Sequence, residues 1–115
     1  MTGDIVSHLQ GVVFYDARGL PQVLFTTREH SIHWTEKSFQ ALHFQECLGE
    51  ILQLPPLQYA YLELQSEKIL LVNQGEGYVA CLWQGTVPEL SAGIIARLQT
   101  LTPDTLRQYP QLVRL

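Results

Sequence analysis

Two short and almost wholly apolar segments, Ile69–Val72 and Tyr78–Trp83, follow one another across the turn-forming sequence of residues 73–77. Successive side chains of a strand point to opposite faces of its sheet. A strand that is apolar at every position therefore needs cover on both faces. This pair predicts two central strands of a sheet, with other elements packed above and below them.

Three further segments have strand character. Val12–Tyr15 and Val23–Thr27 are rich in β-branched and aromatic residues and flank the turn Asp16–Gly19, which predicts a hairpin. Pro21 removes a ladder donor, so the second arm is expected to begin after it. Tyr59–Gln65 alternates, with alanine and leucine on one face and tyrosine and glutamate on the other.

A long middle helix is predicted over Thr35–Leu52, ended by the prolines at 55 and 56. Its apolar positions recur at helical spacing, which predicts a buried stripe. This stripe consists of Ala41, Phe44, Leu48 and Ile51, and Leu42 and Leu52 widen it. Gly49 inside the helix marks either a close backbone approach or a tolerated glycine.

The ends of the chain predict shorter helices. Asp4–Gln10 has an acidic cap, and Pro88 suits the first turn of a helix whose apolar stripe is Leu90, Ile94, Leu98 and Leu101. A last short segment, with helical character, begins at residues 102–104. The predicted order is α-β-β-α-β-β-β-α, a single mostly antiparallel sheet with packed helices, of the α+β class.

The chain has 115 residues, which suits one domain, and its charged fraction of 16% and net charge of −4 exclude a basic nucleic-acid-binding surface. No apolar run is long enough for membrane insertion. The absence of a secretory signal and the sparse cysteines, Cys47 and Cys81, favour a cytoplasmic protein with buried thiols. So little charge indicates that some apolar surface has a partner.

The element order, the segment Leu9-x-Gly11-Val12-Val13, the turn Asp16-x-x-Gly19-Leu20 and the meander Glu67–Trp83 together resemble the Roadblock family, which includes dynein light chains and regulators of bacterial gliding-motility GTPases. The resemblance implies a single domain over residues 1–115, with a core of about 4–101 and a short C-terminal extension. It implies five strands, with the long middle helix on one face and the terminal helices on the other. It also implies a module without a catalytic site or cofactor.

Members of this family dimerise by pairing their third strands and middle helices, which here are Tyr59–Gln65 and Thr35–Leu52. That strand has no lysine or proline at Tyr59–Leu62, as expected of an edge protected by pairing. The implied partners are a second copy and a small Ras-like GTPase. The interface residues expected are Tyr59, Tyr61, Leu62, Glu63, Phe39, His43 and Cys47, and Arg18 and Trp34 are candidates for partner binding.

Three other patterns in the sequence allow different functions. His43 and Cys47 stand four residues apart, as a base and a thiol nucleophile would, and define the alternative of a ligand-sensing or thiol-dependent enzymatic domain. A polar helix flank explains them more simply. His30 and His33 form one pair of zinc-type ligands where a structural site needs two, so no metal is expected. Gly75–Gly77 precedes a strand rather than a helix, which favours a turn over a phosphate loop.

Overall fold

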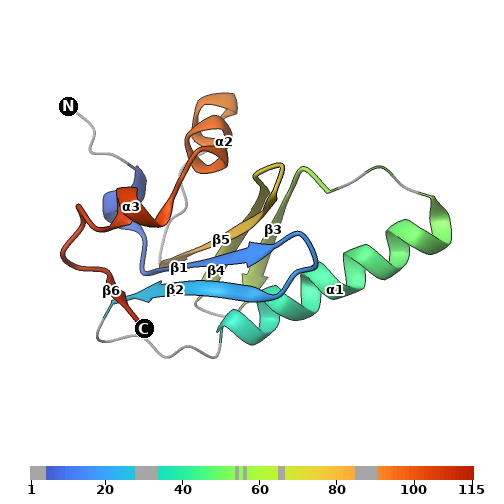
Figure 1. The fold of residues 1–115 in the computed structure, drawn as a ribbon, viewed down its shortest axis with the longest axis horizontal. Coiled ribbons are helices and arrows are strands. Elements are labelled where there is room, and N and C mark those ends of the chain that lie inside the picture. Colours follow the sequence, from blue (N-terminus) through green and yellow to red (C-terminus); the bar gives the residue numbers. More distant parts are fainter. Residues whose placement is uncertain (1–4, 28–33, 54, 56, 65–66, 85–90) are drawn as a thin grey trace.

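The computed structural model describes residues 5–27, 34–53, 55, 57–64, 67–84 and 91–115. One antiparallel sheet of six strands, in the order β3-β4-β5-β1-β2-β6, organises the chain (Figure 1). Its strands are β1 (Gly11–Asp16), β2 (Pro21–Thr26), β3 (Tyr59–Leu64), β4 (Glu67–Asn73), β5 (Gly77–Gln84) and β6 (Val113–Arg114). The remaining elements are η1 (Ile5–His8), α1 (Trp34–Leu52), α2 (Ala92–Gln99) and α3 (Pro103–Leu106).

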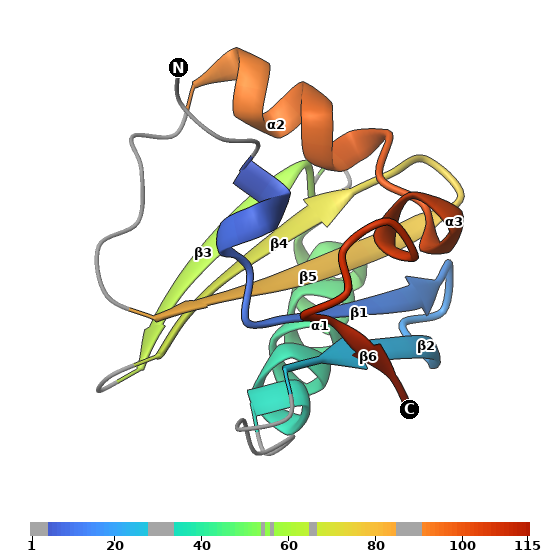
Figure 2. The same ribbon diagram turned by 90° about the vertical axis from the view of Figure 1, so that its left-hand side faces the viewer.

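The two faces of the sheet carry separate apolar clusters. The face toward α1 holds Val13, Tyr15, Trp34, Leu42, Ile69, Leu71, Ala80 and Leu82. The opposite face, covered by η1, α2 and α3, holds a larger cluster that includes Val6, Phe14, Leu70, Cys81 and Leu98. Figure 2 shows α1 on one side of the sheet and α2 on the other. The long helix and the terminal helices therefore cover opposite faces, and the central strands β4 and β5 are buried on both, as predicted.

Both predicted turns are present. At the β1–β2 turn, Asp16 Oδ1 accepts the backbone N–H groups of Arg18 and Leu20 at 2.9 Å, and Gly19 takes φ +82°. At the β4–β5 turn, Gly75 takes φ +91° and its N–H donates to Asn73 Oδ1 at 2.7 Å. A positive φ at the first central residue alone is the pattern of a type II′ hairpin turn. Gly75–Gly77 is thus a turn between strands.

The long helix meets the sheet through Trp34, Ser38 and Leu42, spaced four residues apart. Trp34 lies against Gly11, where an added Cβ would approach the indole Cζ2 to 2.6 Å. Tyr15 on β1 donates its hydroxyl to the carbonyl of Thr35 at 3.1 Å. The first turns of α1 are therefore fixed to β1.

The predicted buried stripe of α1 is wrong in part. Leu42 is buried as predicted, and Ala41 and Leu48 are half-buried, but Phe44 is 65% exposed, Ile51 is 75% exposed and Leu52 is also exposed. The sheet contacts a neighbouring stripe instead, and the C-terminal turns of α1 extend past the end of the sheet (Figure 1). Periodicity shows which apolar residues share a face, but not whether that face is covered within the same chain.

The ends of the chain differ from the predicted element order. In place of the predicted N-terminal helix the structure has a single 3₁₀ turn, η1. The predicted cap, Asp4, lies outside the described residues. A sixth strand, β6, pairs with β2 through Arg114–Phe25 and Val113–Thr26, so five strands was wrong. The short helix after residue 102 is confirmed as α3, with Thr102 as its cap.

The helix expected after Gly85 begins later than its sequence indicated. Its first turn around Pro88 and Glu89 lies outside the described residues, and α2 begins at Ala92 with Ser91 as its cap. Within the part of the chain that the structure describes, no helix combines the length and the apolar character needed to cross a membrane.

Candidate functional site

One flank of α1 presents apolar side chains to solvent. Phe44 and Ile51 are exposed, and they share a helical stripe with the half-buried Ala41 and Leu48. Ala41 packs against the same apolar cluster as Ala60 and Leu62 of β3. Phe39 lines a cavity with the β1–β2 hairpin, and the sheet order places β3 away from that hairpin, so the exposed stripe lies on the flank of α1 that faces the β3 side.

Among the residues that the structure describes, the strand β3 pairs only with β4 and is the first strand of the sheet, so its other edge is free. The backbone N–H of Asn73 donates to the carbonyl of Gln58, two residues that stand opposite each other in this register. Hydrogen-bonded pairs alternate along an antiparallel ladder. Residues 60, 62 and 64 therefore bond to β4, whereas Tyr59, Tyr61 and Glu63 direct their backbone groups to the free edge.

The exposed tyrosines of β3 lie on the other face of the sheet from α1. Tyr59 stands opposite Val72, and Tyr61 opposite Leu70, both residues of the cluster on the α2 side. Leu62 faces α1 and is half-buried. A chain added at the β3 edge would thus contact aromatic side chains on one face and the apolar flank of α1 on the other.

Phe39 and His43, which were also expected at an interface, lie elsewhere on α1. Phe39 and His43 stack with ring centroids 6.3 Å apart and an angle of 3° between the rings. Phe39 lines a cavity shared with Leu20 and Pro21, so it faces the β1–β2 hairpin rather than β3. Cys47 is exposed.

The two candidate partner-binding residues have different environments. Arg18 is exposed at the tip of the β1–β2 turn. Trp34 is 1% exposed and belongs to the core; its indole N–H has no hydrogen-bond partner among the described residues.

Little in the described chain supports nucleophilic or metal chemistry. His43 and Cys47 are both exposed on α1, without an enclosing pocket of catalytic groups. Burial raises the pKa of the Cys81 thiol, which disfavours the reactive thiolate. Among the described residues no three histidine, cysteine or carboxylate side chains group as metal ligands, and His30 and His33 lie outside them.

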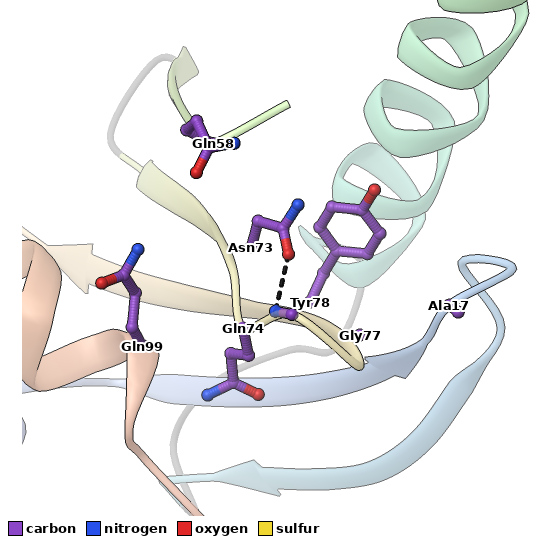
Figure 3. Close-up of a pocket in the computed structure, with 8 residues that line it drawn as sticks. Ala17, Gln58, Asn73, Gln74, Gly77, Tyr78 and Gln99 are labelled. Carbon is purple, nitrogen blue, oxygen red and sulfur yellow. Dashed lines mark hydrogen bonds between the residues drawn. The ribbon is translucent and has the colours of Figure 1, made fainter. Parts of the chain in front are cut away.

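A polar pocket of about 560 Å³ lies beside the β4–β5 turn (Figure 3). Its lining is dominated by the amides of Gln58, Asn73, Gln74 and Gln99, with the ring of Tyr78. Gln74 donates to the carbonyls of Leu98 and Leu101 at 2.9 and 2.8 Å, and thereby holds the end of α2 against the sheet. Asn73 donates to the carbonyl of Leu57 at 2.8 Å. These amides connect secondary-structure elements and supply no general base.

Comparison with solved structures identifies the architecture. A Myxococcus xanthus MglB structure superposes with a TM-score of 0.54 at 12% identity, over 81% of this chain and 75% of that one. The chain has the Roadblock fold. A Roadblock/LC7 domain from Streptomyces avermitilis gives 0.52 at 15% identity, over 90% of this chain and 86% of that one. An MglB structure with a tetrameric arrangement gives 0.56 at 11% identity, over 80% and 73%.

No protein-family profile and no curated protein matches the sequence. The matches to solved structures confirm the resemblance to Roadblock proteins that the sequence indicated. At identities of 11–15%, these structural matches show the fold but not the biochemical role. The role has to be argued from the surfaces described above.

Proposed function

We propose that this Roadblock-fold protein is a non-catalytic interaction module that dimerises through the free edge of β3 and the adjacent flank of α1. The observation that carries the proposal is the coincidence of two unsatisfied surfaces. Phe44 and Ile51 expose most of their side chains beside a strand whose outer backbone groups have no strand partner among the described residues. Long exposed edges are normally protected by pairing, and apolar patches mark interaction sites.

The geometry of β3 favours one register for this pairing. Three residues, Tyr59, Tyr61 and Glu63, direct backbone groups outward. An antiparallel two-fold arrangement that uses all three places Tyr61 opposite Tyr61 of the other copy, and Tyr59 opposite Glu63. Each of these hydrogen-bonded pairs contributes two bonds, which gives about six across the interface. Other registers leave some of the outward groups without a partner.

Light scattering coupled to size-exclusion chromatography tests the dimer. The expected mass is twice the chain mass of 13.1 kDa and should persist through a dilution series. A mass that stays at that of one chain, even at high protein concentration, would refute self-association.

The partner of the dimer is proposed to be a Ras-like small GTPase, which the protein binds or regulates. Support comes from the Roadblock fold and from the resemblance to regulators of gliding-motility GTPases. Arg18 lies exposed at a hairpin tip, where a guanidinium can approach a transferring phosphoryl group. The protein itself would act as a scaffold or co-regulator, because the described residues assemble no acid–base pair.

A pull-down from the native lysate, supplied with either GDP or a non-hydrolysable GTP analogue, tests the GTPase partner. A small GTPase should be enriched in one nucleotide state only. If no GTPase is enriched in either state, this half of the proposal fails, while the dimer is judged separately by its mass.

A further inference from the structure

A second apolar surface lies on the flank of α1 that faces away from β3. A cavity of about 650 Å³ separates the N-terminal half of α1 from the β1–β2 hairpin. Its base is formed by the buried side chains of Val13 and Tyr15, and its rim by Leu20 and Phe39, which are 48% and 37% exposed. This volume is within the range of about 300–1,000 Å³ that binding sites occupy.

A second cavity, of about 320 Å³, lies farther along the same helix. It is bordered by Ala17 and Gly19 of the hairpin, by the C-terminal half of α1, including Gly49, and by Pro55, Leu57 and Tyr78. An added Cβ on Gly49 would have no atom within 4 Å, so this glycine leaves open space rather than a close backbone contact. Together the two cavities follow α1 from Glu36 to Glu50, about 21 Å at the helical rise per residue. We define this surface as the hairpin groove.

The charge of the hairpin groove has one sign. Three glutamates, Glu36, Glu46 and Glu50, line its two cavities, and no lysine or arginine is among the described residues that line them. Arg18 lies nearby at the hairpin tip, between two lining residues. An elongated apolar groove with acidic borders suits a chain segment with apolar anchors and flanking basic residues.

We propose that the hairpin groove binds a short segment of another protein that presents bulky apolar side chains flanked by lysine or arginine. Its apolar anchors pack between Leu20 and Phe39, and its basic side chains meet the glutamates of α1. The stacking of Phe39 on His43 holds one wall in place before binding. Because Phe44 and Ile51 lie on the other flank of α1, the groove stays available when two copies pair through β3. The inference is therefore independent of the proposed dimer.

A phage-displayed library of random dodecapeptides, selected against the wild-type protein, tests the proposal. Enriched peptides should combine aromatic or aliphatic anchors with net positive charge. The variant Leu20→Glu should weaken their binding by about tenfold or more, the scale of one lost apolar anchor. Leu115→Glu is the matched control, because Leu115 is also an exposed leucine but lies outside the groove. It should leave binding unchanged.

The role of the glutamates and the possibility of a different occupant are tested by further variants. Replacing Glu36, Glu46 and Glu50 together by glutamine should weaken the same peptides and reduce the salt dependence of their binding. No enrichment, peptides without a positive bias, or equal binding to Leu20→Glu would each overturn the proposal. If Leu20→Glu instead lowers the mass of the wild-type oligomer, the groove is a contact between copies and the proposal also fails.

Discussion

Replacing Tyr61 with proline removes one backbone N–H from the free edge of β3 and leaves the β3–β4 ladder intact. The alternation set by the Asn73–Gln58 bond places the Tyr61 N–H on the outer side, away from β4. Proline is tolerated on edge strands where the missing N–H would face solvent. The monomer should therefore fold, whereas the proposed pairing loses a donor from each copy.

The loss of dimerisation free energy caused by Tyr61→Pro can be calculated from the register of the paired strands. With Tyr61 opposite Tyr61, the substitution removes two of about six interstrand hydrogen bonds. Each bond contributes about 0.5–1.5 kcal/mol net, and each carbonyl left buried without a donor adds a further cost. A loss of about 2–4 kcal/mol per dimer corresponds to a dissociation constant raised roughly 30- to 1,000-fold.

Sedimentation equilibrium measures this change directly. Tyr61→Thr is the matched control, because it removes the ring but keeps the N–H, and it should dimerise more tightly than Tyr61→Pro. Circular dichroism should show the same fold in both. If Tyr61→Pro dimerises as tightly as the wild type, β3 does not pair through its outer backbone groups.

Three further predictions concern other parts of the structure. Phe44→Asp should shift the protein toward monomer without unfolding it, because the ring is mostly solvent-exposed in a single chain; a fully retained dimer mass would contradict this. Gly11→Ala should lower the unfolding free energy by about 1–3 kcal/mol, since the new Cβ would overlap Trp34, whereas Gly93→Ala in an exposed helix should be neutral or stabilising; denaturant titrations measure both. Burial raises the pKa of Tyr15 to about 12, so the folded state favours the neutral phenol. The stabilising effect of this neutral side chain is complete below pH 10. It is lost as pH rises from about 10 to 12, by at most about 2–3 kcal/mol. Tyr15→Phe should flatten that decline in urea titrations across this range.

The sheet itself could be predicted from local pattern. Ile69–Val72 and Tyr78–Trp83 are apolar at every position, which only central strands allow, and the turns between strands carry the residues that positive φ requires. Strand β6 could not be predicted, because Val113–Arg114 is two residues long and is defined only by its pairing with β2. Such pairing depends on tertiary position and has no periodic signal.

The candidate surface was predicted only in part. The resemblance to Roadblock proteins implied that Tyr59–Gln65 is an edge strand, its lack of lysine and proline was consistent with an edge protected by pairing, and the structure places β3 at the end of the sheet. The buried face of α1 was harder to predict, because two different stripes of residues on this helix have helical spacing. The stripe that contacts the sheet contains a serine, Ser38, and the more apolar stripe with Phe44 and Ile51 faces solvent. Apolar periodicity alone therefore indicated burial without distinguishing the chain's own core from a partner.

Amide hydrogen exchange along β3 tests the central claim most directly. If two copies pair at this edge, the outward N–H groups of Tyr59, Tyr61 and Glu63 should be protected in the wild-type protein, as fully as those that bond to β4. Dilution toward monomer or the Phe44→Asp substitution should selectively remove that protection. Protection that alternates along the strand at every concentration, with the three outward amides exchanging freely, would contradict the account.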